Sequence, residues 1–228
     1  MIRYTVGKAN VTKLHKPQIN FSPKTAQQAE LLHELKNNNL IVAMGPAGTG
    51  KTFTACSQAA IWLVGGHIDR VVLARANVPT GKSLGAIPGT LEEKLEPWVL
   101  PMTDVLRNQM GKAYYDHAVS KGKIETVALE TIRGRSFDNA MILIDEAQQL
   151  TMDELKAITT RIGENSILVL MGDPKQTDKV NLTGLVEFTL LLSKHNINGT
   201  ALVEFHLDDI VRSDTCANMV RMFYKEGL

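Results

Sequence analysis

A glycine-rich segment between an apolar run and a helix-forming run constrains this chain more than any other feature. Residues 45–52 read Gly-Pro-Ala-Gly-Thr-Gly-Lys-Thr, which fits the pattern G-x-x-x-x-G-K-[ST]. The apolar run 40–44 is typical of a buried strand, and the alanine-containing run 53–64 favours a helix. A strand, a glycine-rich turn and a helix in this order form a cradle that binds phosphate through backbone N–H groups and the helix N-terminus.

The same segment predicts a nucleoside triphosphate as the ligand. Lys51 is expected to contact the β- and γ-phosphates, and the Thr52 hydroxyl is expected to ligate Mg²⁺. A chance match is disfavoured because the flanking runs read as the strand and the helix that such a cradle needs. The residues expected to bind the nucleotide are Gly45, Pro46, Ala47, Gly48, Thr49, Gly50, Lys51, Thr52 and Phe53.

Length and composition limit the class of protein. The chain has 228 residues and is 44% hydrophobic, which suits one α/β domain with a sizeable core. No apolar run approaches about 20 residues, so we expect no transmembrane helix and no membrane partner. The first residues lack the apolar core of a secretory signal. Cys56 and Cys216 form no spaced pattern, which favours two small core residues in a reducing cytoplasm over a disulfide or a metal pair.

Positive charge is concentrated at the N-terminus, although the net charge is only +1. The first 24 residues contain no acidic residue, and their basic residues are Arg3, Lys8, Lys13, Lys16 and Lys24. Two interpretations remain open: an arm that contacts a nucleic-acid backbone, and an extension that packs on the domain. We therefore divide the chain into a basic arm, residues 1–21, and a single domain, residues 22–228.

Short apolar runs alternate with helix-forming runs along the chain. Strands are expected at 40–44, 70–74, 125–129, 141–144, 167–171 and 201–206. Helices are expected at 25–36, 53–64, 104–110, 112–121, 151–161, 181–195 and 215–225, with one helical piece inside the Gly/Pro-rich connection 77–101. This alternation predicts a mostly parallel sheet that is buried on both faces, with ligands at the carboxyl ends of its strands.

Polar side chains with a chemical role are predicted at those strand ends. Asp145 and Glu146 follow the strand at 141–144, where Asp145 would hold Mg²⁺ opposite Thr52 and Glu146 would polarise the attacking water. Gln176 follows the strand at 167–171 and would sense the γ-phosphate or orient water. Gln28, in the helix before the first strand, would pair with an adenine edge. An acidic surface pair, an Asp-Pro turn and an exposed helical Gln are the alternatives.

In order and content, these pieces resemble the motor domains of superfamily 1 helicases, and more closely the PhoH-like family of P-loop ATPases. The resemblance extends from residue 22 to residue 224 and is most specific in Arg133-Gly134-Arg135 and in residues 82–89. Its segments are 22–28, 45–52, 73–78, 81–85, 88–89, 132–137, 144–148, 160–163, 172–176 and 209–212. Ala76 departs from the family, whose members often have Pro there.

The resemblance implies a fold, cofactors and partners. It implies a RecA-like P-loop NTPase fold with a mostly parallel sheet sandwiched by helices, and ATP with Mg²⁺ as cofactors. It also implies a ring of subunits, such as a hexamer, and action on RNA or single-stranded DNA. In the resembled helicases, the region equivalent to 77–101 touches the nucleic acid. Here it carries Thr80, Gly81, Lys82, Ser83 and Trp98, and a structural flap is the alternative interpretation.

An additional arginine is expected at the γ-phosphate, where such a group contributes about 10³ to 10⁵ in rate. The chain has room for one motor domain, so the arginine must come from the same chain or from a neighbouring subunit. We predict a neighbouring subunit, and hence a homo-oligomer. Arg212 is the leading candidate, and Arg133, Arg135 and Arg161 are the alternatives. For each of them an ordinary surface salt bridge is the competing interpretation.

The sequence thus predicts a Mg²⁺-dependent ATPase that hydrolyses ATP to ADP and phosphate. We expect hydrolysis to be coupled to binding or unwinding of RNA or single-stranded nucleic acid. The residues expected to take part in catalysis are Lys51, Glu146, Gln176, Arg212 and Arg135. A nucleotide-gated switch or assembly ATPase without motor activity is the alternative, and a small-molecule kinase is disfavoured by Glu146 and Gln176.

Overall fold

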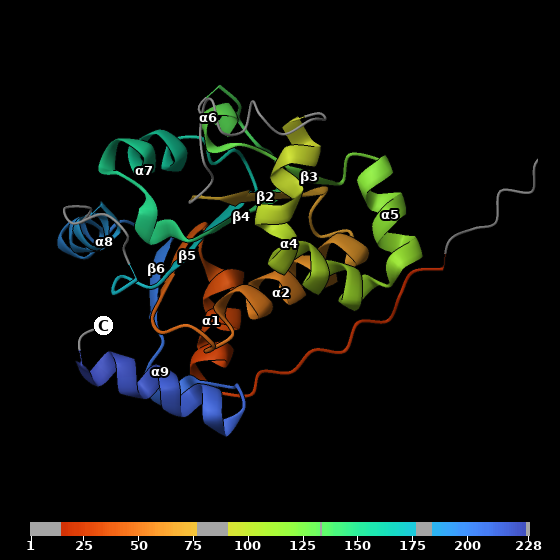
Figure 1. Ribbon diagram of the computed structural model, residues 1–228. Coiled ribbons are helices and arrows are strands. Elements are labelled where there is room, and N and C mark those ends of the chain that lie inside the picture. Colours follow the sequence, from red (N-terminus) through yellow and green to blue (C-terminus); the bar gives the residue numbers. More distant parts are fainter. Residues whose placement is uncertain (1–14, 77–90, 133, 177–183, 227–228) are drawn as a thin grey trace, which may run out of the picture.

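The computed structural model (Figure 1) describes residues 15–76, 91–132, 134–176 and 184–226. Its centre is a sheet of six strands in the spatial order β3-β2-β4-β5-β1-β6. The strands are β1 (Leu40–Met44), β2 (Arg70–Arg75), β3 (Ile124–Thr126), β4 (Ala140–Asp145), β5 (Ile167–Gly172) and β6 (Thr200–Glu204). All pairings between these described strands are parallel, as the alternation of apolar and helical runs predicted.

Each face of the sheet carries its own buried cluster, because side chains alternate between the faces along a strand. Ile41 and Ala43 of β1 belong to one cluster, and Val42 and Met44 belong to the other. The first cluster is covered by α1 (Ala26–Asn37), α2 (Lys51–Gly65), α4 (Leu91–Met110) and α5 (Lys112–Ser120). The second is covered by α6 (Leu129–Ile132), α7 (Met152–Thr159) and α8 (Gly184–His195).

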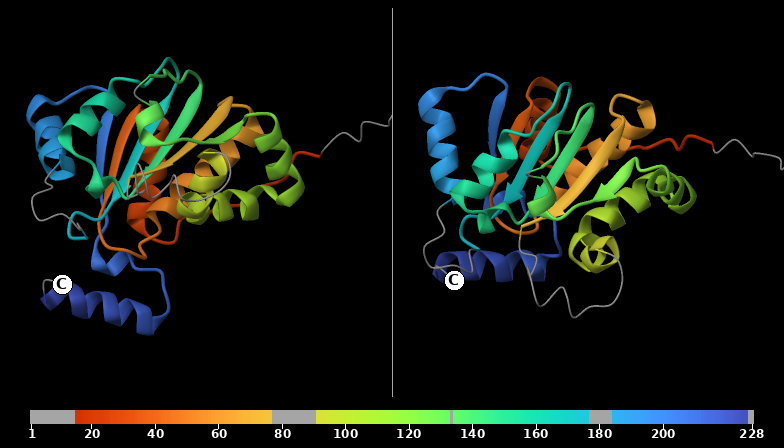
Figure 2. Two further views of the ribbon diagram at one scale, coloured as in Figure 1. Left: turned by 45° about the horizontal axis from the view of Figure 1, so that its top comes forward. Right: turned by 90° about the horizontal axis from the view of Figure 1, so that it is seen from above.

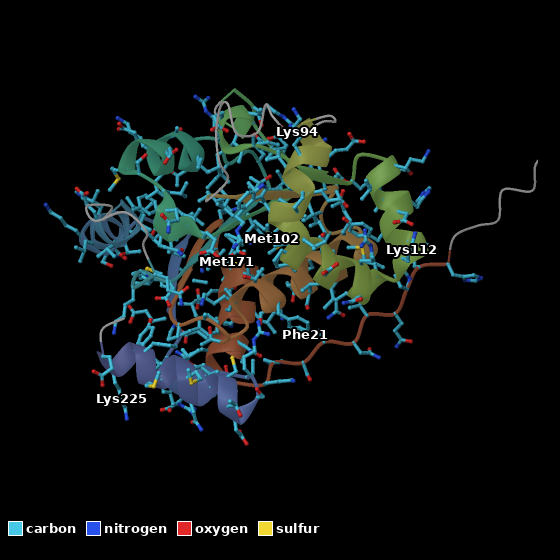
Figure 3. The ribbon with its side chains drawn as sticks, in the orientation of Figure 1. Phe21, Lys94, Met102, Lys112, Met171 and Lys225 are labelled. Carbon is cyan, nitrogen blue, oxygen red and sulfur yellow. The ribbon has the colours of Figure 1, made fainter. Side chains whose placement is uncertain are left out.

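Helices therefore lie on both sides of the sheet, as Figure 2 shows. Figure 3 shows Met102 of α4 and Met171 of β5 inside the molecule, where both are fully buried. Lys112 and Lys225 lie at its surface. The predicted α/β class, a parallel sheet sandwiched by helices, is confirmed.

The strand register brings the expected polar segments to one edge of the sheet. Met44 of β1 lies opposite Gly172 of β5, and Arg75 of β2 lies opposite Asp145 of β4. These four residues are the last of their strands. The segments that follow all leave the sheet at its carboxyl edge, where parallel α/β sheets bind their ligands.

Two elements differ more than the others from the sequence-based expectation. A helix was expected at 104–110, but α4 begins at Leu91 and continues through Pro97 and Pro101. Both prolines are exposed and four residues apart, so the backbone hydrogen bonds that they remove lie along one solvent-facing side of the helix. The strand expected at 125–129 ends at Thr126, because Leu129 already begins α6.

The described part of the predicted arm packs against the domain. Residues 15–23 form neither helix nor strand, but Ile19 packs on the cluster beneath α1 and α2. The Phe21 ring lies edge-on to the Phe53 ring, with centroids 5.7 Å apart. Arg3, Lys8 and Lys13 lie outside the described residues, so the nucleic-acid interpretation of the arm and its boundary at residue 21 stay predictions.

The C-terminal helix α9 (Asp214–Glu226) stands apart from the sheet, as the left view of Figure 2 shows. Ala217 is the buried residue of this helix. The described helices include none that is both long and apolar enough to cross a membrane. Both cysteines are free, and burial raises the pKa of the Cys56 thiol. The expected core position is confirmed for Cys56 and is wrong for Cys216, which is exposed on α9.

Candidate nucleotide-binding site

The loop between β1 and α2 has the backbone of a phosphate cradle. Its glycines Gly45, Gly48 and Gly50 have φ angles of 137°, 83° and 87°, values that residues other than glycine rarely adopt. Gly50 is the N-cap of α2, so the loop leads directly into the positive end of the helix dipole. The hydroxyl of buried Thr49 donates to the Pro46 carbonyl at 2.9 Å and closes the loop on itself.

Lys51 lies across this loop. Its Nζ donates to the carbonyl oxygens of Gly45 at 2.7 Å and Pro46 at 2.8 Å. Burial lowers the pKa of Lys51 to about 8, against the opposing effect of the carboxylates of Asp173, Asp145 and Glu146. A buried ammonium surrounded by carbonyls at a helix N-terminus is well placed to bind phosphate oxygens.

Thr52 and Asp145 meet across the sheet edge. The Thr52 hydroxyl donates to Asp145 Oδ1 at 3.3 Å, although the two residues are 93 positions apart. Burial raises the pKa of the Asp145 carboxyl and neighbouring Glu146 raises it further, whereas Arg75 lowers it. The fold therefore brings the Thr52 hydroxyl next to the Asp145 carboxylate, and their role as Mg²⁺ ligands stays a prediction.

Glu146 follows directly, with its backbone in the left-handed region at φ 55°. Its Oε1 accepts a hydrogen bond from Arg75 Nη2 at 2.7 Å, and its Oε2 accepts one from Gln148 Nε2 at 2.6 Å. Its side chain is 30% exposed, so the carboxylate lies at the boundary between protein and solvent.

Gln28 of α1 contacts the phosphate-binding loop through its side-chain amide. Its Nε2 donates to the Thr49 carbonyl at 2.9 Å, and its Oε1 accepts from the Lys24 N–H at 2.8 Å. The residue is 2% exposed. The predicted contact with an adenine edge must therefore compete with these two contacts, which hold the loop against the start of α1.

The loop after β5 joins the site through Asp173 and Gln176. The Gln148 amide joins the segment after β4 to the loop after β5, because its Oε1 accepts a hydrogen bond from the Asp173 N–H and its Nε2 also donates one to the Gln176 carbonyl. Asp173 Oδ1 accepts a hydrogen bond from the Tyr224 hydroxyl of α9 at 2.8 Å. Burial and this contact raise the pKa of Tyr224.

These elements enclose one cavity of about 720 Å³. Among the predicted site residues, its lining includes Gln28, Ala47, Gly48, Gly50, Lys51, Thr52, Phe53, Asp145, Glu146, Gln176 and Arg212. Gly45, Pro46 and Thr49 complete the loop behind this lining. The volume is in the range of small-molecule sites in proteins.

Of the candidate arginines within the described residues, Arg212 lines the cavity, whereas Arg135 and Arg161 do not. Arg212, which we expected to act from a neighbouring subunit, lines the cavity of its own chain beside Gly48. Arg135 is not brought to the cavity: it pairs with Glu125 at 3.0 Å, and its guanidinium lies over the Phe137 ring. Arg161 is exposed and does not line the cavity, and Arg133 lies outside the described residues.

Several site residues were not assigned a role from the sequence. Arg75 and Gln148 hold Glu146, Asp173 connects the site to Tyr224, and Phe21 lines the cavity next to Phe53. Arg75 and Asp173 follow predicted strands, so their position at the carboxyl edge was the available signal. Thr80, Gly81, Lys82 and Ser83 lie outside the described residues, while Trp98 is half-buried on α4.

A parallel sheet with this loop after its first strand, and a paired acid two strands away, defines the class of P-loop nucleotide-binding proteins. The large terminase of a thermophilic bacteriophage, solved in complex with ADP, has the same fold. The two superpose with a TM-score of 0.52 at 14% sequence identity, and the match covers 89% of this chain and 50% of the terminase chain.

Within this class, the sequence profile of the family described as PhoH-like protein matches residues 20–224, so the chain belongs to the PhoH-like family. A PhoH-like protein of Bacillus subtilis is 36% identical over 206 residues, which cover 90% of this chain and 64% of the relative. Protein PhoH of Escherichia coli is 32% identical over 209 residues, which cover 89% and 58%. The chain thus spans less than two thirds of the length of either relative.

Proposed function

We propose that this protein is a Mg²⁺-dependent ATPase that hydrolyses ATP to ADP and phosphate. The contact between Thr52 and Asp145 carries the proposal. It brings a hydroxyl and a carboxylate from distant segments to 3.3 Å, in the same cavity as Lys51 and Glu146. Phosphate binding, metal binding and water activation thereby become available at one place.

The oxygen atoms of Thr52 and Asp145 fit Mg²⁺. This ion prefers oxygen ligands, and in phosphate-binding sites it takes one or two protein ligands and completes its shell with phosphate oxygens and water. Consistent with that mode, the described residues contain no cluster of three or more His, Cys, Asp or Glu side chains that could hold a metal by themselves. When bound, Mg²⁺ would neutralise charge on the phosphate oxygens.

Side chains of this chain would bind the phosphates, activate the water and stabilise the developing charge. Lys51 binds the β- and γ-phosphates by leaving the carbonyl oxygens of its own loop. Glu146 accepts a proton from water as the water oxygen bonds to the γ-phosphorus and the bond to ADP breaks. Gln176 lines the cavity where it would sense the γ-phosphate. Arg212 is the candidate for charge stabilisation, and its position supports action within its own chain.

Coupling to RNA or single-stranded DNA, and assembly into a homo-oligomer, belong to the proposal on the strength of the helicase-like order of motifs. An arginine in trans would then come from Arg133, Arg135 or Arg161. Native mass spectrometry combined with hydrolysis rates tests this part. A monomer that hydrolyses ATP at the full rate contradicts a requirement for a neighbouring subunit.

A nucleotide-gated switch is the second candidate function. It is favoured by the two hydrogen bonds on Glu146, because an occupied carboxylate implies slow hydrolysis. Salt-dependent stimulation of hydrolysis by single-stranded RNA would favour the motor, and RNA-independent slow turnover would favour the switch.

Phosphate release from ATP tests the proposed activity directly. We expect release by the wild-type chain with Mg²⁺, loss of release with EDTA, and loss of nucleotide binding in Lys51→Ala. Lys112→Ala is a matched control, since Lys112 lies at the surface in a pair with Asp116. Undetectable hydrolysis by a folded wild-type protein, with and without RNA, would contradict the proposal.

A further inference from the structure

Arg75 makes a contact that the proposed reaction does not require. Its Nη2 donates to Glu146 Oε1 at 2.7 Å, in an ion pair whose side chains are 23% and 30% exposed. Gln148 occupies the other carboxylate oxygen at 2.6 Å. Both oxygens of the Glu146 carboxylate are therefore occupied by donors, and Oε1 has to lose its contact with Arg75 before a water molecule can take that place.

The position of Arg75 defines the side from which Glu146 is held. Arg75 ends β2, which is separated from β1 by β4 and β5. Three strand spacings of about 4.8 Å place the end of β2 roughly 14 Å from the end of β1, where the phosphate-binding loop begins. Arg75 therefore comes from the strand on the side of β4 that is away from β1, and it lines the same cavity as the loop.

The guanidinium is also anchored to α4. Arg75 Nη1 donates to the Trp98 carbonyl at 3.1 Å. Its Nε is buried and forms no hydrogen bond with the described residues. Arg75 thus connects Glu146 to the helix that carries Trp98, and any ligand that draws the guanidinium away acts on Glu146 as well.

We propose that Arg75 is a positioning residue that holds Glu146 at rest, and that hydrolysis requires this ion pair to open. The inference rests on the proposed ATPase function. After opening, Glu146 Oε1 is free to accept the proton of the attacking water, while Gln148 still orients Oε2. Single-stranded RNA or DNA is the ligand that opens the pair, because its phosphates compete with Glu146 for the guanidinium.

Removing the guanidinium tests the restraint. In Arg75→Ala, the ATP hydrolysis rate at saturating ATP and without nucleic acid should rise about tenfold, on the order expected for one charge-assisted hydrogen bond. Single-stranded RNA should stimulate the wild-type protein and leave Arg75→Ala unaffected. Arg70→Ala is the matched control, because Arg70 begins the same strand and pairs with Glu125 away from the cavity.

Two further variants keep the test decisive. Arg75→Gln removes the charge at similar size and should show the same rise if Arg75→Ala folds poorly. Arg75→Ala combined with Glu146→Gln should lose hydrolysis, because the gain must pass through Glu146. If Arg75→Ala and Arg75→Gln both fold and bind ATP but hydrolyse it no faster than the wild type, the proposed restraint by Arg75 is wrong, while the proposed ATPase function still stands. Hydrolysis by neither the wild type nor the variants overturns both.

Discussion

The geometry of the phosphate-binding loop can be tested by adding one methyl group. At Gly45, where φ is 137°, a Cβ would overlap the carbonyl oxygen of Phe205, which is backbone and cannot rotate away. At Gly66, where φ is 79°, a Cβ would meet nothing within 4 Å. Both substitutions to Ala impose a left-handed backbone, at about 1–2 kcal/mol. Only Gly45→Ala adds the overlap, which costs about a further 1–3 kcal/mol.

Gly45→Ala should therefore be less stable than Gly66→Ala by about 1–3 kcal/mol. For a chain of this size, that difference corresponds to roughly 2–12 °C in melting temperature. Thermal unfolding followed by circular dichroism, supported by urea titrations, measures both variants against the wild type. Equal melting temperatures for the two variants would refute the close approach of Phe205 to the start of the loop.

Three other predictions concern single side chains. Between pH 8 and 10.5, the free energy of unfolding of the wild type should rise relative to Lys51→Met by up to about 3 kcal/mol. The reason is that Lys51 keeps its proton in the unfolded chain over this range and loses it in the native protein. Urea titrations at a series of pH values that show no such rise would contradict the lowered pKa of Lys51. Tyr224→Phe should lower stability by about 1–2 kcal/mol, through loss of the hydrogen bond to Asp173, and a urea midpoint equal to that of the wild type would exclude this anchor for α9. Arg135→Ala should leave the dissociation constant for ATP unchanged, because its guanidinium pairs with Glu125; weaker binding measured by calorimetry would contradict that placement.

Local sequence patterns were sufficient to predict the framework of the site. The run 40–44, the loop at 45–52 and the helix that follows are neighbours in the chain, so propensity and glycine spacing determine their arrangement. Asp145 ends an apolar strand and Glu146 follows it, and the parallel sheet brings both acids to the same edge as the loop. For these residues, sequence adjacency and topology together define the position.

The contacts that control the site depend on packing between distant segments. Arg75 and Glu146 are 71 residues apart, and Tyr224 and Asp173 are 51 apart, so no local pattern connects them. The path of α4 through Pro97 and Pro101 also depends on packing, because propensity alone ends a helix near proline. Tertiary contacts override propensity in such elements.

Nucleotide binding and turnover of Glu146→Gln, measured side by side, test the central claim most directly. Glutamine keeps the size of the side chain and removes its ability to accept a proton. We therefore expect a dissociation constant for ATP within about twofold of the wild type, and a hydrolysis rate lower by roughly 10²- to 10⁴-fold. A Glu146→Gln protein that binds ATP and hydrolyses it at the wild-type rate would contradict the account.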